Sequence, residues 1–194
     1  FVRPKGFLAL VWKASDTLDI SLKGERRVGQ LDFGDFLSSV DLQQNNTQAG
    51  NPDLVPEQSW ILSTEANQKL GKWGAVKLAL EGGVIEDVVD RIPVGTTGSA
   101  VGNIDEATAW NASISGTINL DPLGGKGLQF QFNWKYSDSE VEDPLTGITR
   151  EISYSDKLNG DVSLRWDIPS TTWTLVAGLE EYQSAPGYRL DEIG

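Results

Sequence analysis

The stretch that decides the fold is Leu128-Gln129-Phe130-Gln131-Phe132-Asn133-Trp134-Lys135-Tyr136. Apolar and mostly aromatic side chains occupy every second position, and amide or charged side chains occupy the positions between them. Because successive side chains of a β-strand point to opposite faces, this alternation predicts a strand with one apolar face and one polar face.

The same alternation recurs along the chain, whereas the i, i+3, i+4 spacing of an amphipathic helix does not. It predicts strands near residues 18–22, 76–81, 110–120, 158–168 and 173–179, with another beginning after Glu57. Residues 7–12 are apolar on both sides, so they predict a strand but not its orientation. We therefore expect an all-β fold, an antiparallel up-and-down meander of about eight strands that forms a single unit over residues 1–194.

The connections between these strands alternate in length. Short ones are predicted near 14–17, 70–72, 121–126 and 169–171, and long polar ones over 28–56, 91–103 and 137–154. Outer-membrane barrels have short turns at one rim and long loops at the other. The alternation of lengths therefore favours a meander that is part of a transmembrane β-barrel.

The tryptophans follow the same two rims. Trp12, Trp73, Trp166 and Trp173 lie beside short connections, and Trp60, Trp110 and Trp134 lie toward the long ones. Aromatic side chains gather at both membrane–water interfaces of a barrel, and this distribution fits that expectation. Only Trp73 has the parity of the polar face, which a bulge or a turn position would explain.

Composition excludes several classes of function. The chain has no Cys and no His, so it has no disulfide, no thiolate metal site and no Ser-His-Asp triad. A net charge of −12 argues against nucleic-acid binding. No pair of carboxylates is singled out for glycoside hydrolysis. We expect a protein that is not an enzyme and has no cofactor or metal centre.

The segment between the longest predicted loop and the next strand carries a motif: Gly50, Asn51, Pro52, Asp53, Leu54, Val55, Pro56 and Glu57. Glycine permits positive φ and the residues around the prolines are held extended, so the segment is typical of a loop that returns into a sheet. These residues closely resemble the G-N-P-x-L-x-P-E segment in the barrels of TonB-dependent outer-membrane receptors. Residues 18–29 resemble the strand before that segment, and residues 57–60 the beginning of the strand after it.

The resemblance implies a receptor with a barrel of about 22 strands, plugged by an N-terminal domain. Such receptors lie in the outer membrane of Gram-negative bacteria, surrounded by lipid and lipopolysaccharide. They import siderophores, cobalamin, oligosaccharides or other nutrients with energy from the TonB complex. No plug and no TonB box occur in this chain, which starts at Phe1 and ends soon after a strand pattern. We expect it to be a segment of the later part of such a barrel, joined to TonB only through a missing N-terminal region.

Two sets of residues are candidates for ligand or cation contacts in external loops. Arg26 and Arg27 could meet an anionic ligand or a lipopolysaccharide phosphate, or form a rim or lumen salt bridge. The acidic residues could bind a hard cation such as Ca²⁺, or simply solvate a loop; they are Asp138, Glu140, Glu142 and Asp143. The motif residues are expected to be mainly structural.

Two other functions remain open from the sequence. The aromatic faces could form the core of a soluble all-β module, such as a sandwich that binds carbohydrate. Alternatively, the eight strands could close into a complete small outer-membrane barrel with a structural or adhesive role.

Overall fold

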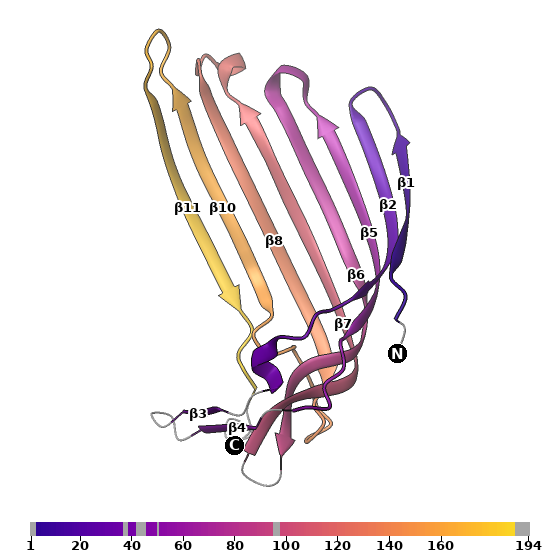
Figure 1. Cartoon of the computed structure of the whole chain (residues 1–194). Coiled ribbons are helices and arrows are strands. Elements are labelled where there is room, and N and C mark those ends of the chain that lie inside the picture. The colour runs from indigo at the N-terminus through magenta and orange to yellow at the C-terminus, as the bar shows by residue number, and fades with distance from the viewer. Residues whose placement is uncertain (1–2, 37–38, 42–45, 50, 95–97, 189–194) are drawn as a thin grey trace.

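The structure is a computed structural model that describes residues 3–36, 39–41, 46–49, 51–94 and 98–188. Eight long strands follow one another in a single antiparallel meander (Figure 1). They are β1 (Gly6–Lys13), β2 (Leu18–Val28), β5 (Gln58–Lys69), β6 (Gly74–Val94), β7 (Gly98–Asn119), β8 (Leu128–Glu142), β10 (Asp156–Asp167) and β11 (Thr174–Ser184). The predictions of an all-β, up-and-down meander and of its number of long strands are confirmed.

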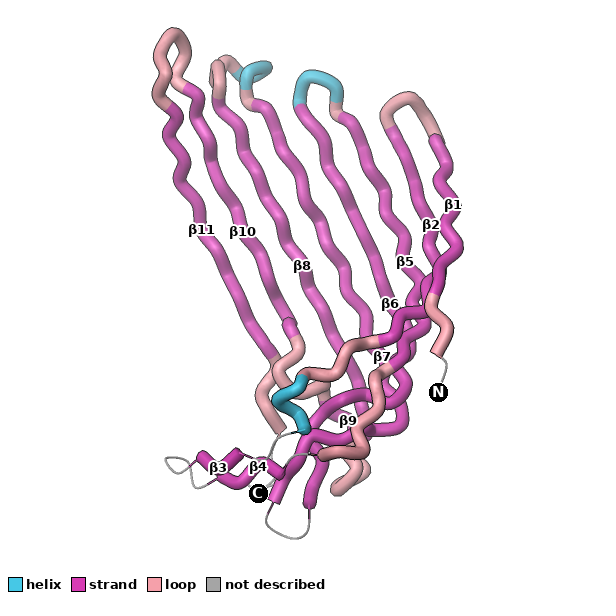
Figure 2. The backbone as a smooth tube through the Cα atoms, in the orientation of Figure 1, coloured by secondary structure: helices cyan, strands magenta, loops and turns pink. Residues whose placement is uncertain are grey.

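The remaining elements are short and lie in the connections (Figure 2). They are β3 (Ser39–Asp41), β4 (Asn46–Ala49), β9 (Thr149–Arg150) and the 3-10 turns η1 (Phe33–Phe36), η2 (Gly71–Trp73) and η3 (Asp121–Leu123). Trp73 belongs to η2, so a turn position explains its parity. No helix in the described ranges is long and apolar enough to cross a membrane.

Strand register places most of the large apolar side chains of the eight strands on one face of the sheet. Leu78 of β6 lies opposite Ile114 of β7, which lies opposite Trp134 of β8. This outward face is open rather than covered. Exposed large apolar side chains in its positions are Leu8, Leu10, Trp12, Leu22, Trp60, Leu62, Leu78, Leu80, Trp110, Ile114, Tyr136, Leu164, Trp166, Leu175 and Leu179.

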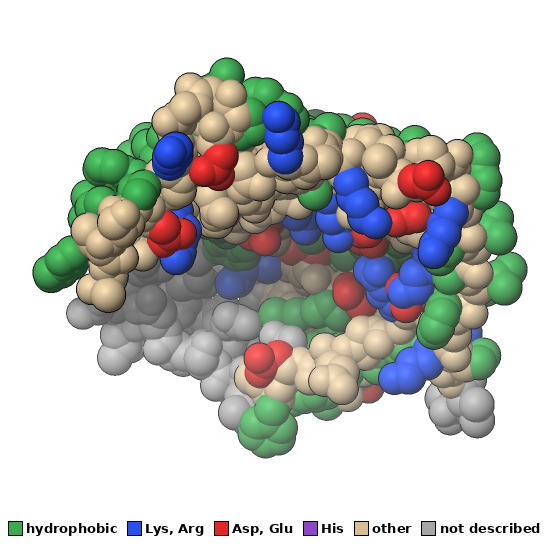
Figure 3. Space-filling view, turned by 90° about the horizontal axis from the view of Figure 1, so that it is seen from above, with side chains coloured by type: hydrophobic (Ala, Val, Ile, Leu, Met, Phe, Trp, Pro, Cys, Tyr) green, Lys and Arg blue, Asp and Glu red, His purple; other side chains and the backbone are tan. Residues whose placement is uncertain are grey.

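The opposite, concave face is polar. Lys77 of β6 lies opposite Ser115 of β7, which lies opposite Asn133 of β8. Seen from above, the acidic and basic side chains gather inside the curve of the sheet and the apolar ones outside it (Figure 3). The period-2 alternation of the sequence is thus converted into two chemically distinct surfaces.

The apolar surface runs obliquely to the hydrogen-bonded rows of the sheet. A row of paired residues that starts at Leu10 in β1 ends at Gln183 in β11. The apolar side chains of β11, Leu175 and Leu179, centre on position 177, which is nearer to the short turn before β11 than Gln183 is. From β1 to β11, the apolar belt therefore shifts along the strand direction together with the short turns (Figure 1).

The sheet is curved but is not closed into a barrel. Its two edges are β1 and β11, and no strand in the described part of the chain pairs with their outer sides. Edge strands present unpaired backbone N–H and C=O groups. Eight strands of this chain therefore form an open wall with two edges available for pairing.

Two of the predicted long loops are wrong in extent. Most of 91–103 is strand, because β6 and β7 continue as one long hairpin, and β8 continues to Glu142. Asp87 has a φ of 57°. Near the long connections, the β6–β7 hairpin curves away from the line of the neighbouring strands (Figure 1). The buried apolar residues of this part, Val88, Ala100 and Ile104, share one face, and Val89 and Val101 on the other face are partly buried. Because apolar residues occur on both faces here, the sequence lacks the clean alternation that marks the rest of the sheet.

The main apolar core of the described residues lies at this loop end and is small. Its buried members are Val88, Ile104, Ala107 and Val141, with Ile85, Ile92 and Ile152 packed against them. The bulk of the chain's large apolar side chains thus lies outside this core, on the outward face.

Candidate functional site

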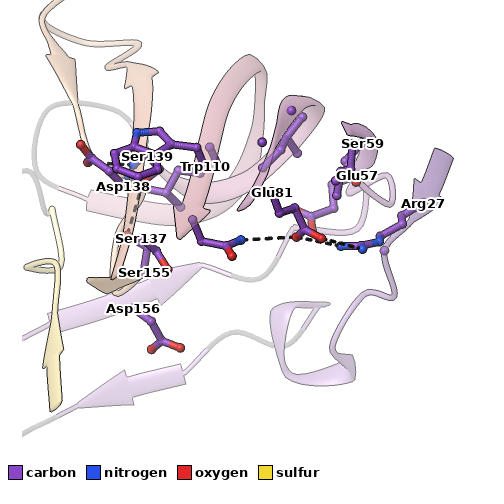
Figure 4. A pocket seen from close by; sticks show the side chains of 18 of the residues that line it. Arg27, Glu57, Ser59, Glu81, Trp110, Ser137, Asp138, Ser139, Ser155 and Asp156 are labelled. Atoms are coloured by element: carbon purple, nitrogen blue, oxygen red, sulfur yellow. Dashed lines mark hydrogen bonds and ion pairs between the residues drawn. The ribbon is translucent and has the colours of Figure 1, made fainter. Parts of the chain in front are cut away.

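The concave face contains a pocket of about 470 Å³ near the loop end (Figure 4). It spans strands from β2 to β10, which the meander places side by side. Its polar lining residues include Arg27, Glu57, Ser59, Glu81, Asn111, Lys135, Ser137, Asp138, Ser139, Ser155 and Asp156. Below, this space is called the concave pocket.

An ion-pair network organises one side of the concave pocket. Arg27 Nη2 lies 3.1 Å from Glu81 Oε2, and Arg27 Nε lies 2.8 Å from Glu25 Oε2. Asn111 Nδ2 donates to Glu81 Oε1 at 3.4 Å, as the dashed lines of Figure 4 show. Arg27 therefore lies on a strand rather than in a loop. Its guanidinium forms a salt bridge on the concave face, which corresponds to the rim or lumen salt bridge predicted as the alternative to ligand contact.

The opposite side of the concave pocket carries hydroxyl groups, an ammonium group and two carboxylates. These groups come from β8, from β10 and from the residue just before β10: Lys135, Ser137, Asp138, Ser139, Ser155 and Asp156. Such a set of donors and acceptors around a few apolar residues suits a polar, uncharged or zwitterionic molecule held by several hydrogen bonds.

Arg26 is separated from Arg27 by the pleat of β2, although the two are adjacent in sequence. Its guanidinium lies over the ring of Trp60, with 5.4 Å between Cζ and the ring centroid. Arg26 Nη1 donates to the carbonyl of Pro4 at 2.6 Å, and Nη2 donates to the side-chain carbonyl of Gln58. The two arginines therefore serve different faces, and neither lies in an external loop as predicted.

The motif segment lies against the long β6–β7 hairpin. Asn51 Nδ2 donates to the carbonyl of Val101 at 3.1 Å, and Asn51 Oδ1 accepts the N–H of Asp53 at 3.0 Å. The side chain of Leu54 is buried. The carbonyl of Glu57 accepts the N–H of Gly29, which joins the two ends of the connection between β2 and β5. Gly50 lies outside the described residues, Pro52 lies in a turn, and Pro56 lies in the irregular segment that leads into β5.

Asn103 of β7, which the sequence did not single out, is the main anchor of the motif. Its Oδ1 accepts the N–H of Val55 at 2.9 Å, and its Nδ2 donates to the carbonyls of Val55 at 2.8 Å and Asp87 at 2.7 Å. One side chain thereby satisfies three backbone groups from two segments. An isolated asparagine in a predicted loop gives no sequence signal for such a role.

The acidic candidates are not gathered in one loop. Asp138, Glu140 and Glu142 lie on β8, and only Asp143 follows it. Glu140 and Glu142 are exposed, Asp138 lines the concave pocket, and Asp143 is buried. Within the described ranges, no group of three or more acidic, His or Cys side chains is arranged to hold a metal ion. Because three of these residues lie on β8 and Asp143 is buried, they do not form the expected external-loop cluster, and that prediction is wrong.

Asp143 belongs instead to a buried ion cluster at the loop end. Arg150 Nη1 lies 2.7 Å from Asp90 Oδ2, and Arg150 Nε lies 2.8 Å from Asp143 Oδ2. The side chains of Arg150, Asp90 and Asp143 are 7%, 3% and 8% exposed. Tyr188 lies 4.8 Å from the guanidinium carbon, measured to the ring centroid. The loop-end ion cluster, Asp90, Asp143 and Arg150, thus joins β6, β8 and β9.

Opposing effects set the pKa of Asp143. Burial alone would raise the pKa of its carboxyl, but the hydrogen bonds from Arg150 and from the amides of Thr146 and Leu145 together hold the pKa below its ordinary value. The pKa of Arg150 is raised although burial opposes its charge, because both carboxylates bind the guanidinium. Asp143 and Arg150 are therefore both charged at neutral pH.

Comparison with known proteins adds no assignment: no protein-family model matches the chain, and no curated protein matches it. The features that bear on function are therefore the two faces of the sheet, the concave pocket and the loop end.

Proposed function

We propose that this sheet is a sector of the wall of a transmembrane β-barrel in the outer membrane of a Gram-negative bacterium. One observation carries the proposal: an open apolar belt crosses all eight long strands, behind a concave face lined by charged and polar groups. Burying a side chain such as Leu, Phe or Trp is worth about 1.5–3 kcal/mol, so an apolar surface of this extent favours contact with lipid.

The ends of the strands support the same proposal. Short turns of the 14–17, 70–73, 120–127 and 168–173 connections lie together at one end of the sheet, and the long connections lie at the other (Figure 2). Exposed aromatic residues stand at both limits of the apolar belt: Trp12, Trp166 and Trp173 toward the short turns, and Trp60, Trp110 and Tyr136 toward the long connections. This is the distribution that two membrane interfaces favour.

Within this class, we propose a TonB-dependent receptor. Residues 50–57 support this proposal through their resemblance to the G-N-P-x-L-x-P-E segment of these receptors. Asn51, Leu54 and Val55 of this segment are anchored onto the β6–β7 hairpin, which gives them a structural reason to occur together. The open edges at β1 and β11 would be joined by further strands of the same barrel. A plug and the contact with the TonB complex would come from residues outside this chain.

The proposed mechanism is nutrient capture from outside, followed by TonB-energised import. The concave pocket lies at the loop end of the lumen side, where an incoming ligand would first meet the wall. Its array of hydroxyl, amide and paired charged groups suits the polar surface of a siderophore, a cobalamin or an oligosaccharide.

The two other functions fit the fold less well. A soluble carbohydrate-binding sandwich needs two sheets packed about 10 Å apart over an apolar core, whereas all eight long strands belong to one sheet with its apolar side open. A complete eight-stranded barrel needs its first and last strands to pair, and β1 and β11 lie at opposite edges.

The proposal is tested in two steps. We expect the purified chain to be monodisperse in detergent micelles and to aggregate when detergent is removed; a monodisperse, cooperatively folding chain in plain buffer would contradict the membrane assignment. We then expect the gene encoding the chain to encode a plug domain upstream, and its deletion to abolish growth on one limiting nutrient. A reading frame without a plug domain would overturn the receptor assignment while leaving the barrel assignment intact.

A further inference from the structure

The outward face carries a groove of about 800 Å³ across β1, β2, β5 and β6. Two glycines form its floor, since Leu62 of β5 lies opposite Gly24 of β2 on one side and opposite Gly82 of β6 on the other. A Cβ atom built at Gly24 would meet no other atom within 4 Å. The missing side chains leave a trough in the apolar belt, below called the outer groove.

Two cationic side chains line the end of the outer groove that is nearer to the long connections. Arg26 and Lys5 line it there, and Arg26 lies over the ring of Trp60, a further lining residue. The acceptors of Arg26 are uncharged, a backbone carbonyl and the amide of Gln58. Within the described part of the chain, its buried Nε has no hydrogen-bond partner.

The one carboxylate among the described lining residues of the outer groove is already paired with other cations. Glu25 also lines the outer groove, but its Oε2 lies 2.9 Å from Lys23 Nζ and 2.8 Å from Arg27 Nε, both of which lie on the concave face. At the end of the groove near the long connections, the positive charge of Arg26 and Lys5 is therefore not compensated by a carboxylate of the lining, and it lies beside an apolar trough.

We propose that the outer groove binds one acyl chain of an anionic lipid, whose phosphate headgroup is held by Arg26 and Lys5. This inference rests on the proposed function, because it takes the outward face to lie in lipid. An acyl chain fills a trough between apolar walls, and charge-assisted hydrogen bonds from a guanidinium suit a phosphate. Trp60 marks the level at which headgroups lie. An uncharged apolar partner would leave the charge of Arg26 uncompensated, and free phosphate would leave the trough unfilled.

The test uses Trp60 as the reporter. The chain in detergent micelles is titrated with phosphatidylglycerol or phosphatidylcholine that carry the same brominated acyl chains, which quench tryptophan fluorescence on contact. Subtracting the signal of a Trp60→Phe variant isolates the response of Trp60 from that of the other tryptophans. We expect phosphatidylglycerol to quench Trp60 at a concentration roughly tenfold lower than phosphatidylcholine does, equivalent to about 1.4 kcal/mol.

Two variants separate the two halves of the site. Gly24→Leu places a side chain in the trough at a position where a Cβ atom meets nothing within 4 Å, and Arg26→Gln removes the charge. We expect each to abolish the tenfold preference for phosphatidylglycerol. Matched controls are Ala177→Leu on the outward face of β11 and Lys126→Gln in an exposed turn at the opposite rim, and both should retain it.

The outcomes distinguish this inference from the proposed function. Equal quenching of Trp60 by both lipids, or an unchanged preference in Arg26→Gln, would overturn the lipid site while leaving the face in contact with lipid. Absence of quenching of every outward tryptophan by either lipid would overturn the membrane assignment and this inference together.

Discussion

The side chain of Asn103 pairs with both backbone polar groups of Val55, although 48 positions separate the two residues. Its Oδ1 accepts the N–H of Val55 at 2.9 Å and its Nδ2 donates to the carbonyl of Val55 at 2.8 Å. The amide of one residue thereby does what the backbone of a neighbouring strand would do. It fixes the end of the motif segment just before β5 begins.

Replacing Asn103 tests this anchor. Asn103→Ala leaves partly buried backbone groups of Val55 and Asp87 without partners, at a cost of about 1–3 kcal/mol in the free energy of unfolding. Asn103→Asp keeps the acceptor for Val55 but loses both donated bonds, so we expect an intermediate loss. Denaturant unfolding followed by circular dichroism measures both values. The control is Asn119→Ala, which removes one exposed bond to Lys72 and should change stability by less than about 0.5 kcal/mol.

The loop-end ion cluster makes a second prediction. Arg150→Met leaves Asp90 and Asp143 buried without their counter-charge, and we expect a loss of about 3–5 kcal/mol. Arg165→Met is the matched control, because Arg165 pairs with Asp167 at an exposed position, and it should cost less than about 1 kcal/mol. Adding Asp90→Asn and Asp143→Asn to Arg150→Met should recover part of the loss. Equal small effects of both single arginine variants would show that the cluster contributes no more than a surface pair.

The lowered pKa of Asp143 predicts a dependence of stability on pH. Folding favours the ionised carboxylate, so its contribution is fully present above the ordinary value of 3.8 and is lost as the pH falls through the lower value in the folded protein. We expect the free energy of unfolding to fall less steeply with acidification in Asp143→Asn than in the parent chain. Asp53→Asn, which changes an exposed carboxylate of the motif, should leave the parent slope unchanged. Identical slopes for the parent and Asp143→Asn would contradict the prediction.

Neighbouring positions on β7 test which face meets lipid. Ile114 lies on the outward face, and Ser115 lies on the concave face. In a bilayer, Ile114→Arg should destabilise the protein by about 2–4 kcal/mol, whereas Ser115→Arg should have a smaller effect. In water, arginine at the exposed position 114 would be tolerated. Unfolding titrations of both variants in lipid vesicles measure the difference, and a larger loss for Ser115→Arg would reverse the assignment of the faces.

Much of the fold could be predicted because most of the sheet has one apolar and one polar face. Strict alternation of apolar and polar residues predicts strands such as 128–136 and 158–168, and the short turns between strands contain Gly, Pro and Asp. The same rule fails beyond Asp87, where β6 and β7 carry apolar residues on both faces and Asp87 itself has a positive φ. A region of mixed polarity there was predicted to be a loop, although most of it is strand.

The candidate site was less predictable than the fold. Arg26 and Arg27 were identified as one pair, but the pleat of β2 sends them to different surfaces. Asp90 and Arg150 were not identified, because 60 positions separate them and nothing in either local sequence indicates burial. Asp143 was identified for its acidic neighbours in sequence, whereas its ion pair with Arg150, seven positions further on, forms because β9 folds back onto β8. Polar contacts between distant segments follow from the topology, which a single sequence does not reveal at that level of detail.

The oblique course of the apolar belt determines an angle. Between Leu10 of β1 and the end of its row at Gln183 of β11, the belt shifts by about six residues over about seven strand spacings. With about 3.3 Å per residue and about 4.8 Å between strands, the strands incline by about 30° to the normal of the belt, somewhat less than the roughly 35–45° of closed barrels. At that inclination about nine residues cross an apolar layer of about 25 Å. The 8 residues of β1 come close to that length, and the 12 residues of β10 exceed it.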